Sequence, residues 1–65
     1  MYINIEIERV RRRLTKSTLA RRLCIDATVL DDWVYRRSAI PAQKLYALLE
    51  IFNGCSADYL LKERR

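Results

Sequence analysis

The sequence predicts an all-α protein, folded as a compact bundle of four to five short helices. Three observations lead to this expectation. The 65 residues include one Gly and one Pro, which leaves little material for hairpin turns. Apolar residues recur at spacings of three and four along most of the chain. They make up 51% of the composition, with charges of both signs interspersed, as in a folded protein and unlike a disordered one.

The first predicted helix runs from about Asn4 to Arg13. Asn4 is a plausible N-cap, and Glu6 in the first turn complements the positive end of the helix. Alternating polarity over residues 2–7 also fits a strand, but the helical period continues beyond it and favours a helix. One apolar stripe, expected to face the core, is formed by residues spaced four, three and four apart: Ile3, Ile7, Val10 and Leu14.

Two further short helices, joined by a tight turn over residues 24–26, are predicted in the middle of the chain. The first runs from about 16 to 23, with the Thr15 hydroxyl as N-cap, and the second from about 27 to 35, with Asp26 as N-cap. The faces expected to be buried are formed by Leu19, Ala20 and Leu23 in the first, and by Leu30, Trp33 and Val34 in the second.

A basic loop over residues 36–40 precedes the last two predicted helices. Pro41 suits the first turn of the fourth helix, and Gly54 is free to adopt a left-handed conformation at its end. Ser56 caps a short fifth helix over about 57–62. Their inward residues are Leu45, Leu48, Leu49, Phe52, Leu60 and Leu61. Because no linker, repeat or low-complexity segment interrupts the chain, we expect one domain over residues 1–65.

The composition argues against several functions. Without His, the chain has no general acid or base near neutral pH and no imidazole ligand, and one Gly excludes a Gly-rich phosphate loop. We therefore expect no enzyme, metal, cofactor or small-molecule substrate. Cys24 and Cys55 form no CxxC motif and are expected to be reduced thiols in the cytoplasm. No apolar run reaches the roughly 20 residues of a membrane span, so no membrane partner is expected.

Four fragments, in order, resemble the phage repressor/Cro type helix-turn-helix family. Residues 14–23 (LTKSTLARRL) look like its L-T-x-x-x-L-A-x-x-L opening, and residues 25–33 resemble its recognition helix. Residues 40–45 are similar to its I-P-x-x-K-L segment and residues 56–61 to its closing S-x-D-Y-L-L. The resemblance covers nearly the whole chain. It implies a lambda-repressor-like fold and a homodimer that binds double-stranded operator DNA. Such a protein is a transcriptional regulator, which blocks or positions polymerase, in a phage, a prophage or another mobile element.

The resemblance also implies roles for individual positions, with the third helix in the major groove. The positions that would contact bases are Ala27, Thr28 and Asp32. Those that would contact phosphates are Lys16, Ser17, Arg36, Arg37, Ser38 and Lys44. Cations and helix N-terminal amides are the groups that hold phosphates, so the residue types fit. The net charge of +5, from thirteen Lys and Arg against eight Asp and Glu, agrees with DNA as a partner.

Two departures from the family pattern matter. The turn carries Cys24 where the family usually has Gly, and a left-handed Cys costs about 1 kcal/mol. The third helix carries Asp31 and Asp32 and no basic residue, although carboxylates repel phosphates. Asp31 could pair with Arg36 or Arg21, and Asp32 could accept a hydrogen bond from a cytosine.

An alternative follows from that acidic helix: a protein-interaction module on the same fold, antitoxin-like or binding an antirepressor, with a basic partner. The family also suggests a dimer surface around Ile40, Leu61 or the loop between the last two helices. The arginines at residues 11–13 are either a solvated face or further phosphate contacts.

Overall fold

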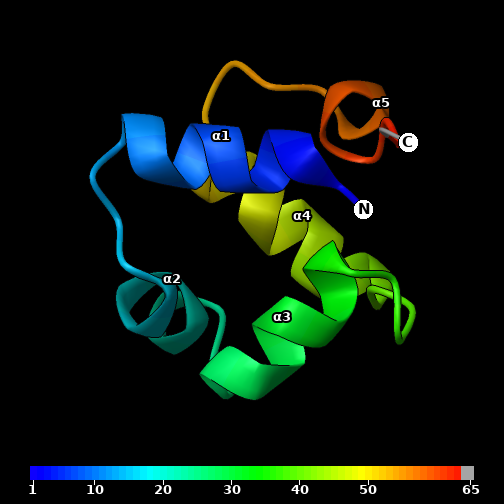
Figure 1. Ribbon diagram of the computed structural model, residues 1–65. Helices are drawn as coiled ribbons and strands as arrows, with labels where there is room; N and C mark the ends of the chain where they lie inside the picture. The colour runs from blue at the N-terminus through cyan, green and yellow to red at the C-terminus, as the bar shows by residue number, and fades with distance from the viewer. Residues whose placement is uncertain (64–65) are drawn as a thin grey trace.

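The computed structural model describes residues 1–63, and over that range it contains five α-helices and no strand. The all-α prediction is confirmed. In Figure 1, α1 crosses the top of the bundle, α2 and α3 lie below it, and α4 passes through the middle. No helix in residues 1–63 is long and apolar enough to cross a bilayer. The helices are α1 (Ile3–Arg11), α2 (Lys16–Arg22), α3 (Ala27–Val34), α4 (Ala42–Ile51) and α5 (Ala57–Leu60).

One apolar core joins all five helices. The predicted inward residues of α2 and α3 are buried, and Trp33 is only 3% exposed, so its core role is confirmed. Leu48 and Phe52 bring α4 and its C-cap into the same cluster, and Leu60 brings α5. The buried apolar residues are Ile5, Leu19, Ala20, Leu23, Leu30, Trp33, Val34, Leu48, Phe52 and Leu60.

The predicted helix caps are partly correct. The Thr15 hydroxyl accepts a hydrogen bond from the Thr18 amide at 3.1 Å, and Ser56 accepts one from the Tyr59 amide at 3.1 Å. Asp26 occupies the N-cap position of α3, but its side chain makes no capping hydrogen bond. Pro41 is the N-cap of α4 and not a residue of its first turn, and α5 ends earlier than predicted.

The same backbone motif ends α1, α2 and α3. A left-handed residue follows each helix: Arg13 with φ 56°, Cys24 with φ 58° and Arg36 with φ 61°. The amide of the next residue closes a six-residue loop, for example from Ile25 to the Ala20 carbonyl at 3.0 Å. The strained Cys24 is therefore confirmed. None of these three residues is Gly, whereas Gly54, with φ 93°, occupies the turn after α4.

The predicted orientation of α1 is wrong. Asn4 is not the N-cap; Tyr2 occupies that position, and Asn4 is 3% exposed, with its side-chain amide donating to the Tyr59 carbonyl at 2.8 Å. Ile7 and Val10 of the predicted inward stripe are 37% and 62% exposed. The buried face of α1 lies on the opposite side of the helix and consists of Asn4, Ile5 and Glu8.

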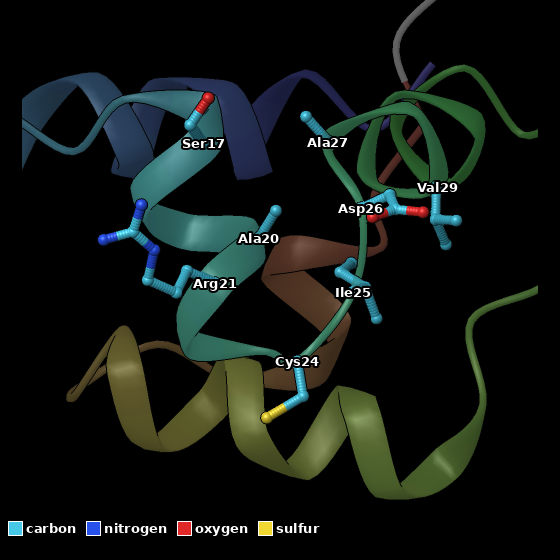
Figure 2. A pocket seen from close by; sticks show the side chains of 8 residues that line it. All are labelled: Ser17, Ala20, Arg21, Cys24, Ile25, Asp26, Ala27 and Val29. Atoms are coloured by element: carbon cyan, nitrogen blue, oxygen red, sulfur yellow. The ribbon is translucent and has the colours of Figure 1, made fainter.

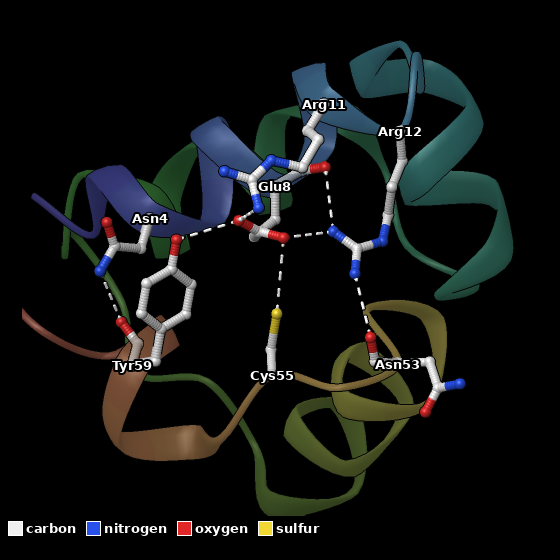
Figure 3. Close-up of polar contacts among 7 residues, drawn as sticks. All are labelled: Asn4, Glu8, Arg11, Arg12, Asn53, Cys55 and Tyr59. Atoms are coloured by element: carbon white, nitrogen blue, oxygen red, sulfur yellow. Dashed lines mark hydrogen bonds and ion pairs between the residues drawn. The ribbon is translucent and has the colours of Figure 1, made fainter.

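A buried carboxylate explains this orientation. Glu8 is 2% exposed and forms an ion pair with Arg12, and the Tyr59 hydroxyl donates to it at 2.9 Å (Figure 3). The Cys55 thiol donates to it at 3.5 Å, and Arg11 lies 3.3 Å away. A buried charge is tolerated only when it is paired and hydrogen-bonded. The observed orientation of α1 is the one that brings Glu8 within reach of Tyr59 and Cys55. Arg12 holds the pKa of Glu8 below its ordinary value of 4.5, with help from Tyr59 and Cys55 and against the effect of burial.

Arg12 also fixes the loop after α4. Its guanidinium donates to the Asn53 carbonyl at 3.1 Å and lies 5.0 Å from the centre of the Phe52 ring. Neither alternative raised for the arginines at 11–13 describes Arg12, which is a structural residue that joins α1 to α4.

Glu8→Gln should remove an acid-sensitive part of the stability. Because the folded-state pKa of Glu8 is depressed, its contribution is fully present above about pH 4.5 and is lost as pH falls through the folded-state value. We expect the variant to unfold more easily at pH 7, by about 1–3 kcal/mol, and to lose less stability than wild type below pH 4.5. Urea unfolding from pH 7 to pH 2.5 measures both, with exposed Glu50→Gln as the control. Equal acid slopes for Glu8→Gln and wild type would contradict this role.

Cys24→Gly should stabilise the protein. A left-handed conformation costs an L-residue roughly 1–2 kcal/mol, and Gly avoids this strain. Gly also loses more chain entropy on folding, which offsets up to about 1 kcal/mol of that benefit. Cys24 is exposed, so no core contact is lost. We expect a gain of about 0.5–1 kcal/mol, seen as a Tm several degrees higher. Gly54→Ala is the matched control and should lower the stability. An added Cβ meets nothing within 4 Å, so only the strain of the left-handed backbone is introduced. A lower Tm for Cys24→Gly would refute the account.

Candidate nucleic-acid interface

Helices α2 and α3 form a helix-turn-helix unit. They pack against each other, and Leu19 of α2, its C-cap Leu23 and Leu30 of α3 all belong to the buried core. The residue in the turn between the helices, Cys24, is left-handed. The unit presents an open depression of about 630 Å³. Figure 2 shows α2 on one side of it, with Ser17 and Arg21, and the chain entering α3 on the other, with Asp26 and Ala27. The first turns of both helices therefore border one concave surface.

The predicted base-contacting residues lie on the first half of α3. Thr28 is exposed, whereas Ala27 and Asp32 are partly buried. Thr28 and Asp32 are four residues apart on the helix and share one face. The structure thus brings two of the three predicted residues onto one accessible strip, with Ala27 beside it at the edge of the depression.

Lys16 and Arg37 flank the acidic residues of α3 and neutralise them. The Lys16 ammonium lies 2.8 Å from a carboxylate oxygen of Asp31, and the Arg37 guanidinium donates to Asp32 at 2.9 Å. The predicted pairing of Asp31 with Arg36 or Arg21 is wrong, because its partner is Lys16. Contact with Asp31 raises the pKa of Lys16, and nearby Glu6, 3.8 Å away, adds to the effect. The surface of α3 is consequently less acidic than its sequence suggests.

The loop after α3 carries three of the predicted phosphate-contacting residues, Arg36, Arg37 and Ser38, and all three are exposed. Arg36 forms an ion pair with Glu63, which raises its pKa, and its guanidinium lies 5.6 Å from the centre of the Tyr2 ring. The Arg37 guanidinium lies 5.2 Å from the centre of the Tyr35 ring. Both arginines are thus oriented by an acidic and an aromatic neighbour while remaining accessible.

Lys44 contacts the helix-turn-helix unit from α4. Its ammonium donates to the Leu23 carbonyl at 2.7 Å, and the side chain is partly buried. Leu23 is the C-cap of α2, where carbonyl groups lack helical partners and favour a cation. Lys44 therefore supports the turn of the unit in the free protein. Its predicted phosphate contact stays a prediction and would require a shared or exchanged hydrogen bond.

One basic residue at the depression was not predicted as a contact. Arg21 is exposed and lines the same surface as Ser17 (Figure 2). Its sequence signal was the spacing of four residues from Ser17, which places both on one face of α2. Ser17 itself is exposed at the start of α2, as its predicted phosphate role requires.

Lys44→Met tests whether Lys44 supports the turn of the helix-turn-helix unit in the absence of DNA. The substitution keeps a long apolar stem but removes the donor to Leu23, so we expect a loss of about 1–2 kcal/mol in the free energy of unfolding without DNA. Exposed Lys62→Met is the control and should change it by less than about 0.5 kcal/mol. If the two variants had the same unfolding midpoint in urea, Lys44 would not support the turn.

Comparison with known proteins agrees with this geometry. The sequence model of a family described as helix-turn-helix matches residues 5–60, which covers all of α2 to α5 and most of α1. No curated protein and no solved structure gives a significant match to the chain. The family match covers the helix-turn-helix unit, the loop after α3 and the helices that support them.

Proposed function

The chain belongs to the helix-turn-helix family, of the phage repressor/Cro type, and we propose that it is a sequence-specific regulator of transcription that inserts α3 into the major groove of operator DNA. Residues 1–65 act as one DNA-binding domain in the cytoplasm of a bacterial or phage-infected cell. The protein regulates transcription in a phage, a prophage or another mobile element, by occupying a promoter and so blocking or positioning polymerase. It is not an enzyme and uses no cofactor.

The arrangement of charge around α3 carries this proposal. Asp31 and Asp32, the strongest objection to DNA, are paired with Lys16 and Arg37 at 2.8 and 2.9 Å. Exposed cations lie on both sides of the helix, on α2 and in the loop at residues 36–38. Phosphate contacts from such flanks would position α3, and its side chains would then read the base edges.

Residue roles follow from accessibility. Thr28 and Asp32 share the strip that would face the bases, with Ala27 near the thymine methyl groups or the backbone. Lys16, Ser17, Arg36, Arg37, Ser38 and Lys44 would contact phosphates, together with Arg21. Binding would require Lys16 and Arg37 to share their carboxylate partners with phosphate, or to exchange one for the other.

Operator binding by a homodimer would supply the affinity that one small unit lacks. A single module buries roughly 600–1,000 Å² on DNA, and two half-sites about one helical turn apart would double this. The dimer surface would lie around Ile40 and Leu61, which line a groove of about 440 Å³ together with Tyr2 and Leu45. Arg36 and Arg37 line the same groove, so the proposed dimer surface adjoins the proposed phosphate contacts.

The alternative function, a module that docks a basic protein through α3, has less support. It depends on free carboxylates, whereas Lys16 and Arg37 already occupy those of Asp31 and Asp32. If the protein captured a basic partner in a pull-down and added DNA did not reduce the capture, protein docking would be favoured over operator binding.

Thr28→Ala and Arg37→Ala should have different effects on DNA binding. Fragments selected from random DNA by the wild type define the site, and affinities are then measured against single-base variants of it. We expect Thr28→Ala to lose about 1–3 kcal/mol of discrimination at one position. Arg37→Ala should weaken all sequences alike and reduce the slope of log K against log salt by about 1.

Exposed Tyr46→Ala on α4 is the control and should change neither quantity. Failure to select any sequence, or a flat salt dependence of the selected one, would reject operator binding. If Arg37→Ala changed the preferred sequence and Thr28→Ala did not, the orientation of α3 in the groove would be wrong.

A further inference from the structure

An ion pair between Glu63 and Arg36 joins the segment after α5 to the loop that follows α3. A terminal nitrogen of the Arg36 guanidinium lies 2.5 Å from a Glu63 carboxylate oxygen, and both side chains are 49% exposed. Leu61, the C-cap of α5, lines the same groove as Arg36, so the end of α5 lies beside the loop. A carboxylate of this chain therefore occupies a guanidinium that the proposed function assigns to a phosphate.

Glu63 differs from the other carboxylates paired at this surface by its place in the fold. Asp31 and Asp32 are residues of α3, where they pair with Lys16 and Arg37. Both would stay with that helix when it enters the groove, so neither can withdraw from the interface. Glu63 lies beyond α5, outside the five helices, so its side chain can move away without unwinding a helix.

Phosphate and the Glu63 carboxylate compete for the same donors of Arg36. A guanidinium holds a phosphate best through two parallel N–H groups, and one of its terminal nitrogens already contacts Glu63. The Tyr2 ring, whose centre lies 5.6 Å from the guanidinium carbon, holds the group in this position. Two anions on one guanidinium also repel each other, at a separation well inside the Debye length of about 8 Å. Contact of Arg36 with phosphate therefore disfavours its contact with Glu63.

We propose that Glu63 competes with DNA phosphate for Arg36, so that the segment after α5 restrains DNA binding until it is displaced. The inference rests on the proposed function, because it takes Arg36 as a phosphate contact. It adds a regulatory contact to that function: whatever draws Glu63 away from Arg36 raises the affinity for DNA. Because phosphates carry no sequence information, the increase is the same for all sequences.

Glu63→Gln tests the competition, because it removes the charge and keeps the size of the side chain. Binding is measured by fluorescence anisotropy with a labelled duplex of random sequence at low salt, since phosphate contacts alone support such binding. We expect the variant to bind about twofold to fivefold more tightly than the wild type. Glu50→Gln, at an exposed position of α4, is the matched control for the same change of net charge and should have a smaller effect.

A double-mutant cycle with Arg36→Gln locates the effect. In the Arg36→Gln background, Glu63→Gln should raise the affinity no more than Glu50→Gln does, because the guanidinium for which the two anions compete is absent. Urea unfolding of each variant separates a change in DNA binding from a change in stability.

Two outcomes would overturn the proposal: a Glu63→Gln variant that binds the random duplex no more tightly than Glu50→Gln, or a gain that persists in the Arg36→Gln background. If Arg36→Gln fails to fold, the comparison of Glu63→Gln with Glu50→Gln still decides the question. Failure of the proposed function would look different, because the wild type would then bind the random duplex but select no sequence.

Discussion

The pairing of the buried Glu8 carboxylate determines the arrangement of this small protein. The Glu8 carboxylate accepts hydrogen bonds from Tyr59 of α5 and from Cys55 of the preceding loop, and it forms an ion pair with Arg12. Arg12 in turn contacts the loop after α4 through the Asn53 carbonyl. The same group therefore orients α1 and fastens both C-terminal elements to it. A buried ion pair is weak as a source of net stability, but breaking one is costly, so it specifies an arrangement effectively.

Charge neutralisation is repeated at the proposed DNA surface. Three of its cations already have carboxylate partners in the free protein: Lys16 with Asp31, Arg37 with Asp32 and Arg36 with Glu63. These contacts are partly exposed and contribute little to stability. Their effect is on orientation, because each cation is held near the face where phosphate would arrive. While these pairs are kept, the carboxylates of α3 repel the DNA backbone less than free carboxylates would.

The fold was predictable from the sequence where its determinants are local. Thr15 and Ser56 cap helices through amides three residues away, and the apolar spacing around Leu30 and Trp33 identifies the inner face of α3. The face of α1 was not predictable in this way. Two of the partners that bury Glu8 are 47 and 51 residues away, and apolar spacing alone indicates the opposite face.

For the candidate site, the family resemblance supplied the residues, but its electrostatics required the structure. The Lys16–Asp31 pair depends on how α2 and α3 pack, and Lys44 reaches the Leu23 carbonyl from a helix that the sequence alone does not place. Local spacing did offer one clue that was not used, since Asp32 and Arg37 are only five residues apart.

The reversed face of α1 also bears on how the chain reaches its native state. Collapse driven by apolar contact alone would bury Ile7 and Val10 and leave Glu8 in water, which is a rotation of the helix to the opposite side. The native orientation becomes favourable only after Tyr59 and Cys55 have been brought into place by α4 and α5. The local apolar pattern and the final structure thus conflict in α1, so the folding landscape is locally frustrated there. Such a conflict favours an order of folding in which α2, α3 and α4 form first and α1 docks last, although α1 is the first helix of the chain.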